Sequence, residues 1–443
     1  MRTKKTPVPF LIPDPLAPLV HILLKRFVLL AFVAAFAGYI SVYAFDLAWP
    51  PIRSDGFSYY VYLPAWFIHH DPTLEATAAD CCAGTLPSYS QTFRHPATGR
   101  WVNPHPIGEA LLIAPFFFVA DALTRWSNLS RDGFSLYYQY AAGVAAIFYL
   151  AAGLSLLRRT LRRRFSEGVT LATLVCILWA TDLFHYATYD SVFSHVFSFF
   201  LLAAYLEIGM RWLSRRTGGY GYAVLLGLIA GEIILVRHTN ALMLLFLAGL
   251  AFESGRLSVR WKEILAAVAM MAAVLVPQLL IYRYASGQWM FSPYGPNGHF
   301  DFAHPQILPV LIGVKKGLFF WSPILLLSCA GIPLMRRHYP GLLLPTLIVL
   351  PATLYIIASW SDWQMGGSFG HRGFTDLMPI FAISLASFFE WSRRTRWAPA
   401  VAVVASLAVA LSIVQMLQYW LRIIPFSDTS WALYRSVFLK LGR

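Results

Sequence analysis

The chain has 443 residues, of which 58% are hydrophobic and only 13% are charged, and its mean hydropathy is +0.58. Soluble globular proteins carry about a quarter charged residues, so this composition excludes a large soluble domain and indicates that lipid surrounds most of the chain. The net charge of +14 does not predict a nucleic-acid partner, because the Lys and Arg residues sit in short clusters between apolar runs.

Apolar runs of about 20 residues, the length that crosses a bilayer as a helix, recur along the whole chain. Each is a candidate membrane-spanning helix. They lie near residues 27–49, 108–123, 136–157, 168–188, 196–210, 220–236, 239–252, 263–284, 317–335, 341–359, 375–391 and 397–421.

One of these runs does not fit a membrane topology. If all crossed the membrane with Lys25 and Arg26 inside, the arginine cluster at 158–164 would face outward, although Lys and Arg collect in cytoplasmic loops. The run at 108–123 is the one to remove, because it is short, follows a proline-rich turn and contains two acidic residues. We expect it to lie in the membrane interface rather than to span.

The remaining runs predict an all-α polytopic membrane protein with about eleven transmembrane helices and the N-terminus inside. The inside segments of this topology hold 21 of the 35 Lys and Arg residues, as the positive-inside rule requires. We expect one transmembrane domain over 1–443, with interfacial helices in a long first outward loop, 50–135, and further outward loops at 285–316 and 360–373. The inside loops are short and basic, so chemistry is expected on the outward face.

An acidic residue, Asp55, opens the first outward loop directly after the first predicted span. Low dielectric and aromatic neighbours such as Tyr59 and Tyr60 raise the pKa of a carboxyl group at membrane level, which suits a general base. The alternative is that Asp55 only caps a helix beginning at Gly56. A similar sequence begins at Asp132, and shared capping chemistry is the favoured explanation for this near repeat.

Two pairs of ionisable residues lie near the outward face. His105 and Glu109 are four residues apart and can share one helix face, as metal ligands do. A turn followed by a carboxylate at a helix N-terminus is the favoured explanation. Asp190 and His195 form the second pair, which fits an ordinary turn and helix start or a functional site at the membrane edge.

Cationic residues at the expected outward boundary are more informative. Arg237 interrupts an apolar stretch, Lys315 and Lys316 precede a predicted span, and His371 and Arg372 follow a glycine-rich segment. Long basic side chains at a membrane boundary often extend their charged ends to the interface without a further role. Together, however, these cations can bind a lipid-linked phosphate, because guanidinium groups and backbone N–H groups suit phosphate oxygens.

These features together resemble the GT-C superfamily of integral membrane glycosyltransferases. The shared features are a first span followed at once by an acidic motif (Asp55), an interfacial segment after Pro104-His105-Pro106-Ile107, and a basic turn at Arg158–Arg164. The branch most similar is that of protein O-mannosyltransferases and lipid A aminoarabinose transferases, often called family 39. The likeness covers the chain up to about residue 250 and the rest mainly by topology.

The resemblance implies transfer of a sugar, with inversion, from a polyprenyl-phosphate-linked donor to a glycan, lipid or protein acceptor at the outward face of a bacterial inner membrane. It implies a general base at Asp55. No metal site is secure, and a divalent metal is left as an option. Many relatives carry Asp-Glu where this chain has Asp55-Gly56, which leaves the acceptor class open. The implied phosphate ligands are Arg237, Lys315, Lys316 and Arg372, and the implied pocket residues are Tyr59, Tyr60, His105, Glu109, Asp190, His195 and His371.

A lipid or polysaccharide transporter without transferase activity is the alternative class. It predicts charged residues midway through several spans and two repeated halves with broken helices. Most charges lie at span ends instead, with Glu207 and Glu232 as exceptions, and no half-to-half repeat is found.

Overall fold

The computed structural model describes residues 17–48, 50–80, 92–215, 219–255, 260–290, 294 and 298–442. Within these residues the architecture is all-α, apart from one antiparallel hairpin in which Phe93 pairs with Val102 and Arg94 with Trp101. The elements of the first half are α1 (Ala17–Ala44), α2 (Asp55–Tyr60), α3 (Tyr62–Phe67), α4 (Glu75–Asp80), β1 (Phe93–Arg94), β2 (Trp101–Val102), α5 (Gly108–Arg125), α6 (Leu136–Arg162), α7 (Glu167–Trp179), α8 (Leu183–Thr188) and α9 (His195–Ser214). Those of the second half are α10 (Tyr220–Val236), η2 (His238–Met243), α11 (Leu244–Glu253), α12 (Trp261–Ser286), α13 (Ile307–Ile312), α14 (Leu318–Trp321), α15 (Ile324–Gly331), η4 (Ile332–Arg337), α16 (Pro340–Ala358), η5 (Arg372–Leu377), α17 (Met378–Ser392), α18 (Ala398–Trp420) and α19 (Trp431–Val437).

Seven helices in the described part of the chain are long and apolar enough to span a membrane, which makes this an integral membrane protein. They are α1, α6, α9, α12, α16, the continuous η5–α17 segment and α18. The helix expected in the interface, α5, is not among them, because its 18 residues include three charged side chains.

Four of the eleven expected spans are shorter or broken. Two are the short helix α10 and the combined η2–α11 segment. The expected run 168–188 ends as α7 at Trp179 and resumes as α8. The run 317–335 is divided among α14, α15 and η4, and Pro323 and Pro333 stand at its two breaks, where a proline removes a backbone donor and interrupts the helix.

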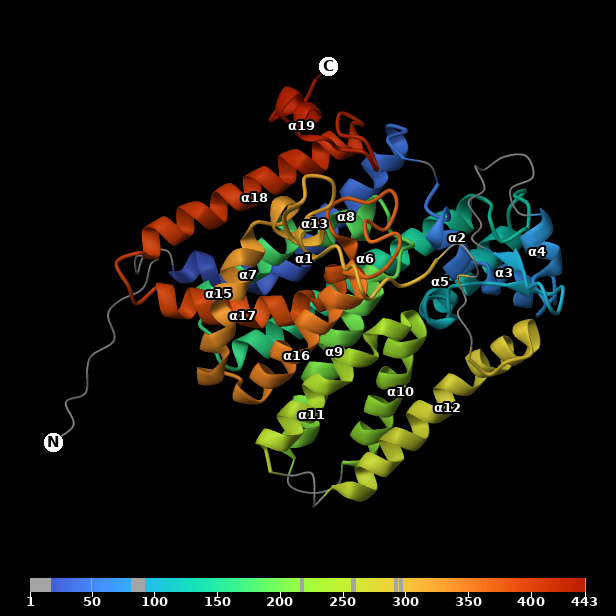
Figure 1. Ribbon diagram of the computed structural model, residues 1–443, viewed down its shortest axis with the longest axis horizontal. Coiled ribbons are helices and arrows are strands. Elements are labelled where there is room, and N and C mark those ends of the chain that lie inside the picture. The colour runs from blue at the N-terminus through green and yellow to red at the C-terminus, as the bar shows by residue number, and fades with distance from the viewer. Residues whose placement is uncertain are drawn as a thin grey trace.

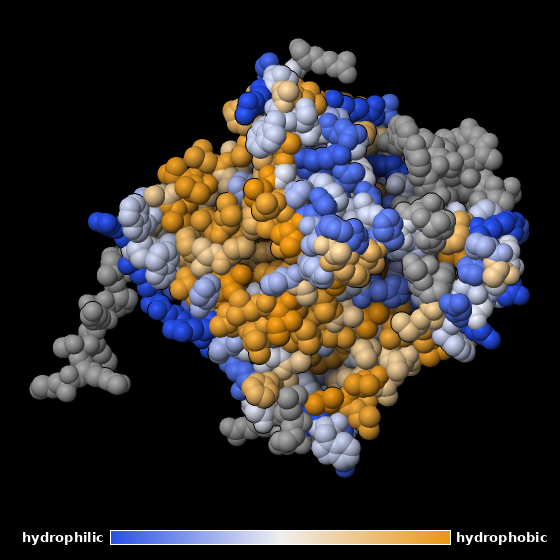
Figure 2. Space-filling model, viewed as in Figure 1, coloured by the Kyte–Doolittle hydropathy of each residue, from blue (hydrophilic) through white to orange (hydrophobic). Residues whose placement is uncertain are grey.

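The helices form a bundle in which α9 and α17 are central and almost completely buried. By contrast α12, which packs against α10, buries only residues near its C-terminal end. Large apolar side chains such as Leu29 of α1, Leu265 of α12 and Leu407 of α18 are more than half exposed. Figure 2 shows the resulting apolar belt across the molecule, with polar residues on either side of it. A belt of this kind is what lipid chains cover.

The first-loop helices α2, α3 and α4 lie together at one edge of the molecule, and the turn between α17 and α18 lies at the opposite edge (Figure 1). The N-terminal end of α5 packs against the C-terminal end of α10. At this crossing a Cβ atom on Gly108 would overlap the backbone of Leu235 and Val236. The absence of a side chain at Gly108 therefore lets the first loop dock directly on the bundle beside Arg237.

Replacing Gly108 by Ala is expected to lower the free energy of unfolding by about 1–3 kcal/mol, because the added methyl group forces backbone apart. Thermal unfolding of the purified protein in detergent measures the change. The matched control is Gly221→Ala in α10, where an added Cβ has nothing within 4 Å. Equal loss of stability at both positions would contradict the close approach of α5 and α10.

Candidate active site

Asp55 is held at the start of α2 by a constrained turn after α1. The turn is anchored by Ile52, whose N–H donates to the Gln139 side chain at 2.9 Å. The residue before Asp55, Ser54, has a φ of 51°, an uncommon conformation for a residue other than glycine that often accompanies functional sites. The helix begins at Asp55 itself rather than at Gly56.

Gly56 lies directly against the segment between α8 and α9. A Cβ atom at this position would lie 2.5 Å from the Val192 carbonyl oxygen. Any side chain at position 56 would therefore push α2 away from the segment between α8 and α9, and Asp55 stands there as a single carboxylate.

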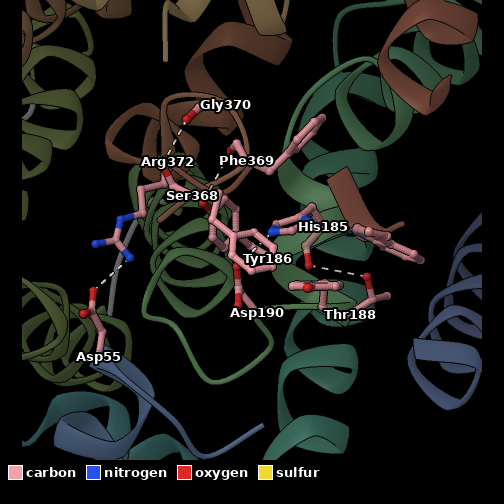
Figure 3. Close-up of polar contacts among 12 residues, drawn as sticks. Asp55, His185, Tyr186, Thr188, Asp190, Ser368, Phe369, Gly370 and Arg372 are labelled. Atoms are coloured by element: carbon pink, nitrogen blue, oxygen red, sulfur yellow. Dashed lines mark hydrogen bonds and ion pairs between the residues drawn. The ribbon is translucent and has the colours of Figure 1, made fainter. Parts of the chain in front are cut away.

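Arg372 faces Asp55 from the opposite end of the chain. Its Nη1 lies 2.8 Å from the Asp55 Oδ2 atom, and both side chains are only 12–13% exposed. The guanidinium also lies 5.2 Å from the ring centroid of Phe193. A turn with positive φ at Gly366 and Gly370 leads into η5 and directs Arg372 toward α2 (Figure 3). The ion pair thus joins the loop 360–373 to the loop that follows α1.

A second charged cluster lies beside this pair. Asp376 accepts a hydrogen bond from His195 Nδ1 at 2.8 Å and lies 3.4 Å from Nη1 of Arg237. The Asp376 carboxylate is 2% exposed, whereas the Arg237 side chain is 20% exposed. The buried carboxylate therefore holds a guanidinium that reaches the cavity described next.

A cavity of about 620 Å³ connects the two clusters, within the range of about 300–1,000 Å³ that is common for small-molecule sites. Its polar wall contains Asp55, Arg372, Arg237 and a second, exposed carboxylate, Asp362, and its apolar wall comes from η2 and α16. Six of the twelve residues singled out from the sequence line it. These are Asp55, Tyr59, His105, His195, Arg237 and Arg372.

Burial and neighbouring charges act in opposite directions on Asp55. Burial alone would raise its pKa, but the Arg372 guanidinium, with smaller effects from His105 and His195, outweighs burial and holds the pKa below its ordinary value. The expectation that the surroundings raise the pKa of Asp55 is therefore wrong. It failed because Arg372 is far from Asp55 in the sequence, and only the fold makes it the partner of Asp55.

Burial favours the uncharged form of both His105 and Glu109. Burial lowers the pKa of His105 to about 4, and its ring lies edge-on to Tyr59 with the centroids 4.3 Å apart. Burial, and then the charge of Asp55, raise the pKa of Glu109 well above its ordinary value. Both Glu109 oxygens are buried and have no hydrogen-bond partner among the described residues. His105 lies before the start of α5 at Gly108, so the two residues do not share a helix face as expected.

Asp190 does not line the cavity. It stabilises the turn before Asp55 through its contact with Arg53. It lies 2.7 Å from Nη2 of Arg53 and accepts a hydrogen bond from Nε2 of His185 at 2.9 Å. Trp420 donates its indole N–H to Nδ1 of the same histidine at 2.9 Å, so the His185 proton is on Nε2. Figure 3 shows His185 and Asp190 on the far side of Tyr186 from Arg372.

Lys315 and Lys316 have separate surroundings, and neither lines the cavity. Lys315 pairs at 2.9 Å with Asp428, which is exposed. Lys316 is 2% exposed and donates to the carbonyl oxygens of Ser368 and Phe426. Burial, followed by the charge of Arg372, lowers the pKa of Lys316 to about 7. Lys316 therefore ties the glycine-rich loop to the C-terminal segment.

Tyr60 and His371 also lie outside the cavity lining. The Tyr60 hydroxyl donates to the Gly133 carbonyl at 2.7 Å, and the His371 ring is buried, with neither nitrogen hydrogen-bonded among the described residues.

Sequence reasoning missed Asp376, Arg53 and His185. Asp376 follows Arg372 by one helical turn, so this spacing was the available signal.

Among the described residues no group of three or more His, Cys, Asp or Glu side chains is arranged to hold a metal ion. Comparisons of the chain with protein-family models, curated proteins and solved structures found no match. The chemistry of this site therefore has to be argued from its own geometry.

Replacing Asp376 by Asn is expected to lower the free energy of unfolding by on the order of 3 kcal/mol, because it leaves a mostly buried guanidinium without its carboxylate. Thermal unfolding in detergent measures the loss. Asp428→Asn removes the exposed partner of Lys315 and should leave the unfolding temperature unchanged. A neutral result at Asp376 would show that Arg237 does not depend on it.

Proposed function

We propose that the protein is a glycosyltransferase that moves a sugar from a polyprenyl-phosphate-linked donor to an acceptor hydroxyl at the outward membrane face. The observation that carries the proposal is the meeting of the Asp55 carboxylate with two guanidinium groups, Arg372 and Arg237, in one cavity with an apolar wall. A carboxylate suits proton removal, paired guanidinium groups suit a phosphate, and an apolar wall suits a lipid chain.

The apolar wall is the feature that favours a lipid-linked donor over a soluble one. It is formed by side chains of η2 and α16 on the membrane-embedded part of the bundle. These are Leu242, Met243, Val349, Thr353, Ile356 and Ile357. The first isoprene units next to the phosphate would lie against this wall, where burial of apolar surface contributes to binding.

The proposed reaction is a single displacement. The Asp55 carboxylate takes the proton of the acceptor hydroxyl while that oxygen forms a bond to the anomeric carbon of the donor sugar. The bond between this carbon and the phosphate oxygen breaks, and its electron pair leaves with polyprenyl phosphate. Arg372 and Arg237 stabilise the negative charge that develops on the leaving oxygen. Attack from the face opposite the leaving group inverts the anomeric configuration, and Asp55 then returns its proton to water.

The proposed topology has eleven membrane crossings, with the N-terminus inside and the cavity facing the exterior of a bacterial inner membrane. The short helix α10 and the η2–α11 segment count as crossings in this arrangement. The basic residues at the ends of α6 and α17 would then lie inside, as the positive-inside rule favours.

Transport of a lipid or polysaccharide is the second candidate. Glu232 in α10 favours it, because this side chain is 6% exposed and its Oε1 atom has no hydrogen-bond partner among the described residues. Ionisable groups at such depth often serve transport pathways. A transporter would move its lipid without breaking the bond between sugar and phosphate, so a transfer assay separates the two.

Asp55→Asn is expected to reduce sugar transfer by about 10²- to 10⁴-fold, the range for loss of a general base. The assay uses membranes containing the protein, radiolabelled polyprenyl-phosphate sugars and a panel of glycan, lipid and peptide acceptors. The matched control is Asp132→Asn in the similar sequence. Asp132 Oδ1 accepts the backbone N–H groups of Phe134 and Ser135 at 2.7 and 2.8 Å, and an asparagine oxygen can replace it. Transfer at the wild-type rate by Asp55→Asn would reject Asp55 as the base.

The topology is tested with reporter fusions after Ser214, Arg237 and Ser254. Alkaline phosphatase is active only outside the cytoplasm and green fluorescent protein fluoresces only inside. We expect fluorescence after Ser214 and Ser254 and phosphatase activity after Arg237. The same reporter response at all three positions would mean that α10 and α11 do not cross, and would contradict the eleven-crossing arrangement.

A further inference from the structure

The proposed base and one proposed phosphate ligand are bound to each other in this structure. Asp55 Oδ2 and Arg372 Nη1 are 2.8 Å apart, and both residues line the cavity. A carboxylate that accepts a charge-assisted hydrogen bond is a weak proton acceptor. A guanidinium whose charge is already compensated is also a weaker phosphate ligand. Each residue therefore reduces the ability of the other to perform its proposed role.

The second guanidinium provides a contrast. Arg237 is held by Asp376, which is 2% exposed and also bound to His195. Asp376 does not line the cavity, so an incoming ligand can contact Arg237 without separating it from its carboxylate. Asp55 differs because its carboxylate lies on the cavity wall itself. A ligand that binds Arg372 from the cavity must therefore compete with Asp55.

We infer that the donor phosphate takes the place of Asp55 on Arg372, so that donor binding itself releases the general base. This inference rests on the proposed function and adds an order of events to it. The phosphate supplies the negative charge that the guanidinium requires, and the Arg372 donors pass from one anion to the other. The Asp55 carboxylate is then available to an acceptor hydroxyl only after the donor is in place.

The electrostatic consequence has a definite sign. The Arg372 guanidinium is the strongest of the neighbouring charges that lower the pKa of Asp55. A bound phosphate compensates that cation and adds a negative charge nearby, so both changes raise the pKa of Asp55 and make it a stronger base. The other titratable groups that interact with Asp55 are His105, Glu109, His195 and Tyr294.

The exchange also protects the donor. Were Asp55 a strong base before the donor and acceptor were aligned, it could activate water against the sugar–phosphate bond. Coupling base release to the phosphate position restricts proton removal to the assembled site, as in other enzymes that assemble their catalytic groups on substrate binding.

The decisive measurement is equilibrium binding of radiolabelled undecaprenyl phosphate to the full-length protein in lipid nanodiscs. Asp55→Asn is expected to bind about five- to tenfold tighter than wild type, because Arg372 no longer has a competing carboxylate. Arg372→Gln should bind more weakly than wild type. In the Arg372→Gln background, adding Asp55→Asn should produce no tightening, and Asp132→Asn should bind as wild type does.

Binding experiments with other ligands identify which kind of phosphate the site prefers. Undecaprenol, which has no phosphate, should bind equally to wild type and Asp55→Asn. Inorganic phosphate and phosphatidylglycerol are added as competitors, the first as a free phosphate and the second as a phosphate of a bilayer lipid. Neither should displace undecaprenyl phosphate at equal concentration. Displacement by either of them would overturn a site selective for a polyprenyl-linked phosphate.

Several results would overturn the exchange. Wild-type or weaker affinity in Asp55→Asn, with clear binding by wild type, rejects the exchange and leaves the proposed function standing. Equal tightening in the Arg372→Gln background rejects the ion pair as its cause. An absence of binding by every form, together with an absence of transfer, rejects the proposed function and the exchange with it.

A measurement on the wild-type protein guards against misfolded variants. The acidic limb of the pH profile should lie at higher pH for kcat, which reports the donor-bound protein, than for kcat/KM of the donor, which reports the protein before donor binding. Coincident limbs, or a limb for kcat at lower pH, would overturn the exchange.

Discussion

Opposite charges that are mostly removed from water must remain paired, and this constraint organises the part of the molecule around the cavity. The Asp55–Arg372 pair joins the beginning of the chain to the loop before α17, at an exposure of only 12–13% for either side chain. Separating such a pair without a replacement partner is costly in a medium of low dielectric. The loop that follows α1 and the loop 360–373 are therefore held together by a contact that only another ion can replace.

The same constraint explains how two further guanidinium groups are held in and beside the cavity. Arg53 is neutralised by Asp190, and Arg237 by Asp376. Each carboxylate is fixed in turn by a histidine, His185 in the first case and His195 in the second. Histidine suits this role because its neutral ring donates a hydrogen bond to a carboxylate without adding a further charge. The scaffold thus supports two guanidinium groups in a largely apolar bundle.

A site with this balance favours chemistry in which one anion is exchanged for another. In the proposed reaction the cavity offers cations to a phosphate and the Asp55 carboxylate to a proton, but that carboxylate is already paired with Arg372. The proposed lipid-linked phosphate would resolve this conflict, because it would bring its own charge together with an apolar chain for the wall formed by η2 and α16. Catalytic electrostatics of this kind depends on groups that are held in place before the reaction begins.

The sequence by itself determined the lipid environment, the all-α class and the exclusion of α5 from the spans, because these follow from local composition and charge. It also singled out Asp55, Arg237 and Arg372, which the structure brings to one cavity. The count of eleven crossings stays a prediction, since α10 and η2–α11 are short and Pro323 and Pro333 divide another run.

Only the tertiary structure decided which boundary charges share a cavity. Lys315 and Lys316 are neighbours in sequence, yet one pairs with exposed Asp428 and the other is buried against backbone carbonyls. His371 and Arg372 are also neighbours in sequence with different surroundings. The His371 ring is buried away from the cavity, whereas the Arg372 guanidinium lines it. Adjacent side chains outside regular helices point in directions set by long-range packing, and that packing is not encoded in local charge or hydropathy.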